Sequence, residues 1–259
     1  MVREQYEIEV WGTILYIAAI STTLEKSAIE TAIENVKKFL FEVDDVFSTY
    51  KSESVISKLR RGEIEIGGCS DDVIEVWSAC GFASELSEGA FNPWAVVGGF
   101  DPSGYVKGWA ADRVADMLVA AGVEHVQVNA AGDLTLRGGF LTQEGVREPW
   151  KIGVVNPDNP QEVLRVFEIT DGAIATSGTY ERGAHIIDPH SGLIAIGAKS
   201  ATVIGPDGGL ADAMATALMV AGDDGSQWFG REELLDYSAW VIERNDGGAW
   251  GVGPLITAR

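Results

Sequence analysis

The segment GGLADAMATALMVAG, residues 208–222, constrains the fold more than any other part of the chain. A helix that is apolar on all its sides has to be buried, and this one is shorter than the roughly 20 apolar residues of a membrane span. We therefore expect a helix in the interior of a globular protein. It carries Asp212 and Thr216, which lie four positions apart and so share one face of the helix.

The length and the N-terminal segment favour one cytoplasmic domain. The chain has 259 residues, and no run of Pro, Gly or Ser is long enough to be a linker, so we expect a single domain over residues 1–259. Residues 1–20 place acidic side chains before an apolar run and alternate polar with apolar, which differs from a signal peptide. We therefore expect a cytoplasmic protein that does not span a membrane.

The charge balance excludes one large class of partners. The chain has 19 Lys plus Arg against 39 Asp plus Glu, a formal net charge of −20, which repels a phosphate backbone. We expect no nucleic-acid partner, and an anionic ligand would need local cations, a metal ion or backbone N–H groups. Cys69 and Cys80 match neither a metal motif nor a disulfide framework, so we expect them to serve packing.

Apolar periodicity predicts three further helices. Residues 27–47 carry apolar side chains at helical spacing, and Ser27 with Glu30 predicts a capping box at the start. A second helix is expected over residues 71–86, capped by Ser70, and a third over residues 108–121, stopped by Gly122. The inward positions of the first of these helices are Ile29, Ile33, Val36, Leu40, Val43 and Phe47.

Strands fill most of the remaining chain without a regular βαβ alternation. Residues 6–20 are predicted as one strand, and HVQVNAAGDLTLRGG, residues 125–139, as two strands around a Gly-containing turn. Further strands are expected at residues 150–155, 164–169, 200–205 and 238–243. The pattern predicts an α+β architecture with a largely antiparallel sheet and packed helices.

Asp212 and Thr216 are the first candidates for chemistry. A carboxylate and a hydroxyl on one helical face could hold one hard cation, for which Mg²⁺ is suited. The alternative is that Asp212 lies in the first turn, favoured by the helix dipole, while Thr216 bonds to a backbone carbonyl. The spacing alone favours the alternative.

Two loops offer other candidates. FDPSGYVKGWAAD, residues 100–112, is a Gly-bearing loop leading into a helix, where Lys107 and backbone N–H groups could meet phosphates, or where Lys107 could be solvated in a simple turn. The segment AHIIDPHSG places His185 and His190 on either side of Asp188. The two histidines could bind a metal or one of them could act as a general base; alternatively, the segment is an ordinary turn. The hydroxyl-rich IATSGTYERG and FSTYKSES are typical of solvated connections.

Taken in order along the chain, these segments resemble the ApbE-type FAD:protein FMN transferase family, also called flavin transferases. The resemblance spans residues 11–218, and its elements are WGTIL, FSTYKSES, GAFNP, DPSGYVKGWAAD, VNAAGDL, IATSGTYERG, AHIIDPHSG and LADAMATAL. It implies a T-fold-related α+β architecture. It also implies a metal-dependent enzyme that cleaves the FAD pyrophosphate, joins FMN through a phosphoester to a threonine of an acceptor flavoprotein and releases AMP.

The resemblance also implies roles for individual residues. Asp212, Thr216 and the backbone carbonyl of Gly104 would hold Mg²⁺ against the pyrophosphate, and Lys107 would support the phosphates. His185 is the candidate general base for the acceptor hydroxyl. The remaining expected FAD contacts are Trp11, Tyr50 (stacked on a ring of FAD), Ala90, Phe91, Asn92, Asp101, His185 and Ile186. The family commonly has Met where Trp11 stands and Asp where Asn92 stands.

Two other functions fit the same residues. In an FAD pyrophosphatase, water would replace the acceptor threonine and the products would be FMN and AMP. A non-catalytic flavin-binding module would keep a ring-stacking Tyr50 but have no use for a metal, and the retained Asp212 and Thr216 argue against it.

Overall fold

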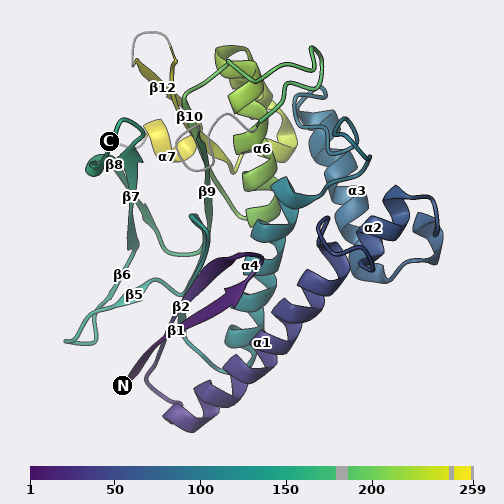
Figure 1. Ribbon diagram of the computed structural model, residues 1–259. Helices are drawn as coiled ribbons and strands as arrows, with labels where there is room; N and C mark the ends of the chain where they lie inside the picture. The colour runs from purple at the N-terminus through teal and green to yellow at the C-terminus, as the bar shows by residue number, and fades with distance from the viewer. Residues whose placement is uncertain (179–185, 245–247, 258–259) are drawn as a thin grey trace.

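The computed structural model describes residues 1–178, 186–244 and 248–257 (Figure 1). Its central feature, within these ranges, is an eight-stranded sheet in which every neighbouring pair is antiparallel. The strands, in spatial order, are β1 (Val2–Val10), β2 (Thr13–Ser21), β3 (His125–Ala130), β4 (Asp133–Arg137), β9 (Gly172–Gly178), β10 (Ser200–Gly205), β11 (Ser238–Ile242) and β12 (Ala249–Val252). The predicted α+β class with a largely antiparallel sheet is confirmed.

Helices cover one face of this sheet (Figure 1). The helix α4 (Ser103–Ala120) lies on β3 and β4, and α6 (Gly208–Ala221) lies on β9 and β10. The long helix α1 (Lys26–Phe47) packs on the outside of α4, while α3 (Asp71–Leu86) packs against α6. The short helix α2 (Val55–Arg60) follows α1.

Two small sheets cover part of the other face. They are the hairpin β7 (Trp150–Asn156) with β8 (Asn159–Ile169), and the pair β5 (Phe140–Leu141) with β6 (Arg147–Glu148). Successive side chains of a strand point to opposite faces, and the side chains of the main sheet that meet Trp150 and Phe167 alternate with those that meet the helices. The chain is completed by η1 (Ile66–Gly68), η2 (Gly222–Gly230), η3 (Glu232–Leu234) and α7 (Pro254–Thr257).

The interior helix predicted at residues 208–222 is α6. Its side chains are buried on all sides over its first two turns, as the all-apolar composition predicts. The side chain of Asp207 caps it by accepting a hydrogen bond from the Leu210 N–H at 2.7 Å. The helix ends at Ala221, and Gly222 is its C-cap. Among the described residues, no helix is both long and apolar enough to cross a membrane.

Glycines let the backbones of α4 and α6 approach each other closely. A Cβ atom at Gly108 would lie 2.7 Å from the backbone nitrogen of Gly209 and would overlap the carbonyl oxygen of Gly208. A Cβ atom at Gly209 would lie 2.6 Å from the ring of Tyr105 on α4. Since real Cβ atoms do not approach so closely, the separation of the two helices depends on these glycines.

A largely buried carboxylate fixes the same two helices to the sheet. Asp112 on α4 accepts hydrogen bonds from the Thr135 hydroxyl on β4 at 2.7 Å and from the N–H of Gly208, the first residue of α6, at 2.6 Å. Burial raises the pKa of the Asp112 carboxyl from 3.8 to about 6. One side chain thus joins three elements beneath the α4–α6 contact.

Several sequence predictions are wrong in extent. The strand predicted at residues 6–20 is the hairpin of β1 and β2, with Trp11 and Gly12 at the turn. The turn is not visible in the sequence pattern because Trp11 occupies it in a left-handed conformation (φ +56°), which glycine adopts far more readily than tryptophan. The segment IATSG is not a solvated loop but part of β9, at the centre of the sheet.

The helix starts also differ from the sequence prediction. The helix α1 begins at Lys26, so Ser27 and Glu30 lie inside it and form no capping box. Ser70 does precede α3, but its side chain makes no capping hydrogen bond. The helix predicted from residue 108 begins at Ser103. Gly104 and Gly108 are poor helix formers, which argues against a helix here from the sequence. The structure accommodates both because the α4 backbone lies close to its neighbours at these positions.

The remaining predictions on packing hold. The six inward positions predicted for α1 are all buried, and β7, β8, β10 and β11 fall on the segments predicted as strands. Cys80 is buried in the core, Cys69 is partly buried, and neither forms a disulfide.

The glycine contact predicts opposite effects for two matched substitutions. Gly108→Ala forces α4 and α6 apart and should lower the free energy of unfolding by about 2 kcal/mol or more. Gly81→Ala, also inside a helix, places its Cβ 3.8 Å from Trp94 and should raise stability by about 0.5–1 kcal/mol. Urea unfolding of both variants measures this, and equal effects would contradict the role assigned to the contact.

The pKa of Asp112 predicts how its contribution to stability changes with pH. Because this pKa is higher in the folded state, the folded protein binds more protons between about pH 4 and pH 6, and the contribution of Asp112 falls as pH rises through that window. The difference in Tm between wild type and Asp112→Asn should therefore shrink from pH 4 to pH 7. Asp116→Asn, on the exposed side of the same helix, controls for the lost charge. A difference independent of pH would contradict the shift.

Candidate functional site

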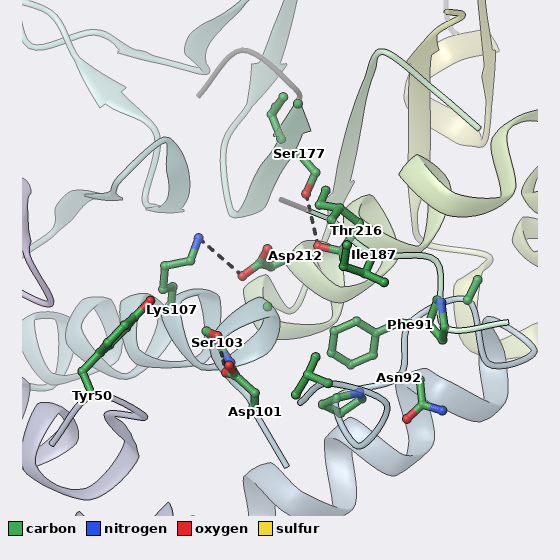
Figure 2. A pocket seen from close by; sticks show the side chains of 18 residues that line it. Tyr50, Phe91, Asn92, Asp101, Ser103, Lys107, Ser177, Ile187, Asp212 and Thr216 are labelled. Atoms are coloured by element: carbon green, nitrogen blue, oxygen red, sulfur yellow. Dashed lines mark hydrogen bonds and ion pairs between the residues drawn. The ribbon is translucent and has the colours of Figure 1, made fainter. Parts of the chain in front are cut away.

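A pocket of about 380 Å³ lies where α4, α6 and the end of β9 meet three connecting segments (Figure 2). In this view Tyr50 and Lys107 stand at one end, Phe91 and Asn92 at the other, and Asp212 and Thr216 lie between them. The predicted site residues that line the pocket are Tyr50, Ala90, Phe91, Asn92, Asp101, Gly104, Lys107, Ile186, Asp212 and Thr216.

Two predicted residues stand apart from this set. Trp11 lies in the β1–β2 turn, where it is partly buried against the core, and it is not among the residues that line the pocket. His185 lies outside the described residues, although its neighbour Ile186 lines the pocket. The roles expected of Trp11 and His185 stay predictions.

Asp212 and Thr216 form one wall of the pocket. The side chain of Asp212 is only 5% exposed, and the hydroxyl of Thr216 lies 3.2 Å from that of Ser177 at the end of β9. Asp212 lies beyond the first turn of α6, so stabilisation by the helix dipole does not explain why a carboxylate is present at this position. The carboxylate that caps the helix is Asp207. The glycine at 104 brings the first turn of α4 close, since a Cβ there would lie 3.6 Å from the Thr216 hydroxyl oxygen.

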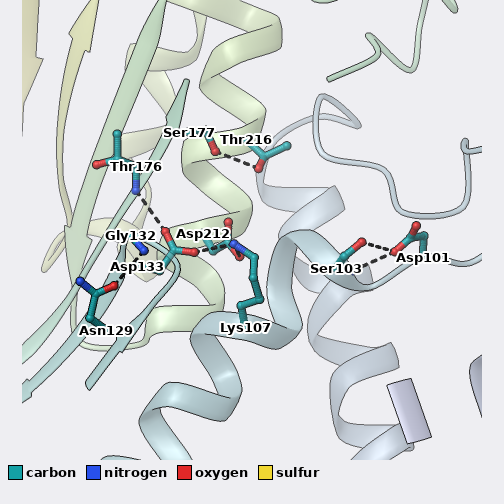
Figure 3. Close-up of polar contacts among 10 residues, drawn as sticks. All are labelled: Asp101, Ser103, Lys107, Asn129, Gly132, Asp133, Thr176, Ser177, Asp212 and Thr216. Carbon is teal, nitrogen blue, oxygen red and sulfur yellow. Dashed lines mark hydrogen bonds and ion pairs between the residues drawn. The ribbon is translucent and has the colours of Figure 1, made fainter. Parts of the chain in front are cut away.

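Lys107 projects from α4 toward two buried carboxylates (Figure 3). Its ammonium donates to Asp133 Oδ2 at 2.7 Å and lies 3.7 Å from Asp212 Oδ2. It is therefore not the solvated lysine of a turn. It lies inside α4, which begins four residues before it, and its ammonium forms an ion pair with the carboxylate of Asp212.

The other walls come from loops held by short-range hydrogen bonds. Asp101 accepts from both the backbone N–H and the hydroxyl of Ser103 and so fixes the start of α4. Asn92 accepts from the Trp94 N–H at 3.0 Å. Phe91 is buried, whereas Tyr50 has 98% of its surface exposed and presents a free ring at the pocket mouth.

An aromatic cluster supports the segment between Asn92 and Asp101. The rings of Trp77, Trp94 and Phe100 lie with centroids 4.5–5.1 Å apart. Such contacts add to the stability that burial of the rings provides. The short connection is therefore anchored to α3 through Trp77.

The turn after Asp188 follows the simpler sequence interpretation. Asp188 accepts hydrogen bonds from the Ser191 hydroxyl at 2.6 Å and from the His190 N–H at 2.9 Å, and these bonds lower the pKa of its carboxyl. His190 is exposed in this turn. Within the described part of the chain, no group of three or more His, Cys, Asp or Glu residues is arranged to hold a metal.

Sequence reasoning missed several residues of the site. Asp133 was visible only as part of a turn in VNAAGDL, and no sequence pattern joins it to Lys107, 26 positions away. The hydroxyl-rich sequence around Thr176 and Ser177 is typical of a solvated connection, but both residues lie in β9. The other lining residues not predicted are Pro93, Val96, Ser103, Gly178, Ile187 and Pro189.

The comparison with protein families gives the class. The sequence model of the ApbE family matches residues 98–239, more than half of the chain. The matched range contains most of the residues that line the pocket, including those on α4, at the end of β9 and on α6. The chain belongs to the ApbE family.

Individual relatives agree. The chain is 41% identical over 101 residues to the FAD:protein FMN transferase of Vibrio cholerae. This alignment covers 36% of this chain and 29% of the relative. It is 34% identical over 95 residues to the enzyme of the same name from Escherichia coli, covering 33% of this chain and 26% of the relative. These alignments thus span less than a third of the curated relatives.

Solved structures match over nearly the whole chain. The flavin transferase ApbE from Vibrio cholerae superposes with a TM-score of 0.81 at 25% identity, covering 97% of both chains. The ApbE protein of Thermotoga maritima gives a TM-score of 0.81 at 23% identity over 96% of both chains. The Pseudomonas stutzeri flavinyl transferase ApbE, in its apo form, gives 0.80 at 24% identity over 100% of this chain and 98% of the other. The ApbE fold expected from the sequence is confirmed.

Proposed function

We propose that this chain is a Mg²⁺-dependent FAD:protein FMN transferase. It would cleave the pyrophosphate of FAD, attach FMN through a phosphoester to a threonine of an acceptor flavoprotein and release AMP. The observation that carries the proposal is the meeting of Asp212, Thr216 and Lys107 in one pocket with the exposed ring of Tyr50. The name of the curated relatives, FAD:protein FMN transferase, supports the transfer of FMN from FAD to a protein.

The proposed metal ligands are Asp212, Thr216 and the backbone carbonyl of Gly104. All three supply oxygen, the donor that Mg²⁺ prefers, and the absence of a side chain at Gly104 keeps the first turn of α4 close to Thr216. The buried carboxylate of Asp212 supplies the charge. When bound, Mg²⁺ would neutralise negative charge on the pyrophosphate and polarise its oxygens.

The other lining residues would bind and orient FAD. Lys107 lies where an ammonium can meet the phosphates, which the negative field of the chain would otherwise repel. Tyr50 would stack on a ring of FAD, and Phe91 with Asn92 would border the flavin. Ala90, Asp101 and Ile186 would complete the FAD contacts.

The transfer itself depends mainly on alignment. The acceptor hydroxyl attacks the phosphorus of the FMN half while the bond from that phosphorus to the AMP oxygen breaks, so catalysis consists of holding nucleophile and leaving group in line and neutralising charge. We assign the proton of the acceptor hydroxyl to His185, on the segment that precedes the pocket residue Ile186. Trp11 as a flavin contact remains part of the proposal.

Chromatography of AMP and FMN after incubation with FAD tests the reaction. Reactions contain or lack Mg²⁺ and a candidate acceptor flavoprotein, and a variant of that acceptor with alanine at its target threonine is the control. We expect AMP release that needs Mg²⁺ and covalent FMN only on the intact acceptor. Free FMN formed at a rate independent of the acceptor would indicate a pyrophosphatase instead, and a chain that does not bind FAD would end the proposal.

Loss of the Asp212 carboxylate should abolish the Mg²⁺-dependent turnover. Asp212→Ala deletes the charged ligand, so we expect turnover at saturating Mg²⁺ to fall by about 100-fold or more, while part of the FAD affinity remains. Asp223→Ala removes an exposed charge just after α6 and serves as the control. Full activity of Asp212→Ala, with folding verified by circular dichroism, would rule out the proposed ligand.

Tyr50 should contribute to FAD binding through its ring. Tyr50→Ala is expected to raise the Kd for FAD by about 3- to 10-fold, whereas Tyr50→Phe keeps the ring and should bind as wild type does. Val97 is as exposed as Tyr50 but does not line the pocket, so Val97→Ala is the matched control. Isothermal titration calorimetry measures all four Kd values, and an unchanged Kd for Tyr50→Ala would contradict the stacking.

A further inference from the structure

Lys107 lies between two buried carboxylates at unequal distances. Its ammonium is 2.7 Å from Asp133 Oδ2 and 3.7 Å from Asp212 Oδ2 (Figure 3). Both carboxylate side chains are almost fully buried, with 6% and 5% of their surfaces exposed. Coulomb attraction is strong in such surroundings, so the lysine is a potential competitor for any cation that Asp212 is to bind.

The position of Asp133 is fixed by main-chain contacts on both sides. It is the first residue of β4, directly after a tight turn in which the Asn129 side chain accepts from the Gly132 N–H at 2.8 Å. Its other oxygen, Oδ1, accepts from the Thr176 N–H on β9 at 3.3 Å, beyond the last β4–β9 pair, Leu134 with Ile174. The carboxylate is therefore a rigid acceptor for the flexible lysine.

The geometry suits an arrangement in which each carboxylate binds a different cation: Asp133 binds the Lys107 ammonium, and Asp212 binds a metal ion. A hydrogen bond between ionised groups at 2.7 Å is much stronger than an ion pair at 3.7 Å without that geometry. While Asp133 holds the ammonium, the Asp212 oxygen is shared with it only at the longer distance. If the charge of Asp133 were lost, the same ammonium would be drawn to Asp212.

We propose that Asp133 is a positioning residue that holds Lys107 away from Asp212, so that the Asp212 carboxylate stays available to a divalent cation. The proposal rests on the metal site given under the proposed function. It assigns to Asp133 no contact with the metal or with FAD. Its role is carried through Lys107.

A double-mutant cycle with Mn²⁺ as the probe tests this role. Mn²⁺ binding to the purified chain is followed by electron paramagnetic resonance in the absence of FAD, so that the readout does not depend on activity. Asp133→Asn should raise the Kd for Mn²⁺ by about fivefold or more, because the ammonium moves to Asp212. In the Lys107→Met background the same substitution should change the Kd much less.

A control and a direct structural measurement accompany the cycle. Asp116→Asn removes an exposed carboxylate of α4 that pairs with Arg137 and should leave the Kd unchanged. A crystal structure of Asp133→Asn should place the Lys107 ammonium within hydrogen-bond distance of Asp212. This crystal structure shows whether Asp133 holds the lysine in place even if the Lys107→Met variant does not fold.

The outcomes separate this inference from the proposed function. Equal changes in Kd in both backgrounds, or a lysine that stays in place in Asp133→Asn, would show that Asp133 acts only as a charge or as part of the fold, and the inference would be wrong while the metal site stands. A wild-type chain that binds no Mn²⁺ would overturn the metal site and the inference with it.

Discussion

The close contact between the backbones of α4 and α6 is the constraint on which the site depends. Lys107 belongs to α4 and Asp212 to α6, and their charged groups come within 3.7 Å only because Gly108, Gly208 and Gly209 leave no side chains between the helices. Asp112 then fixes the start of α6 to α4 and to β4. The apolar surface of α6 drives its burial, and the glycines set the distance between α6 and α4 and therefore which side chains of the two helices come into contact.

Charge at the centre of the pocket follows from this packing. One partly buried ammonium lies with two buried carboxylates, so these three groups sum to a negative charge in a protein that already carries −20. Buried charges need compensation from neighbours of opposite sign. A divalent cation beside Asp212 would supply it and would at the same time allow an anionic substrate to approach.

Local sequence patterns predicted what is local in the structure. The apolar periodicity of α1 and the uniform apolar surface of α6 fix their burial without reference to the rest of the chain, and Asp212 with Thr216 share a face because both lie on one helix. The resemblance to a known family supplied the pocket residues of the loops. Asp133 could not be found in this way, because its contact with Lys107 exists only once β4 lies beneath α4. The β1–β2 turn was missed since Trp11 takes a conformation that its residue type rarely adopts.

The strand β9 carries a further consequence. Ala173, Ala175 and Ser177 share the face on which α6 rests, while Ile174 faces the opposite core. A one-residue insertion early in this strand would turn the larger Ile174 and Thr176 toward the helix and remove the Ser177 hydroxyl from Thr216. In homologous chains, length changes should therefore be absent from β9 and gather in the peripheral β7–β8 hairpin, whose pairing already contains irregular register. The pocket thus limits where the chain can vary in length during evolution.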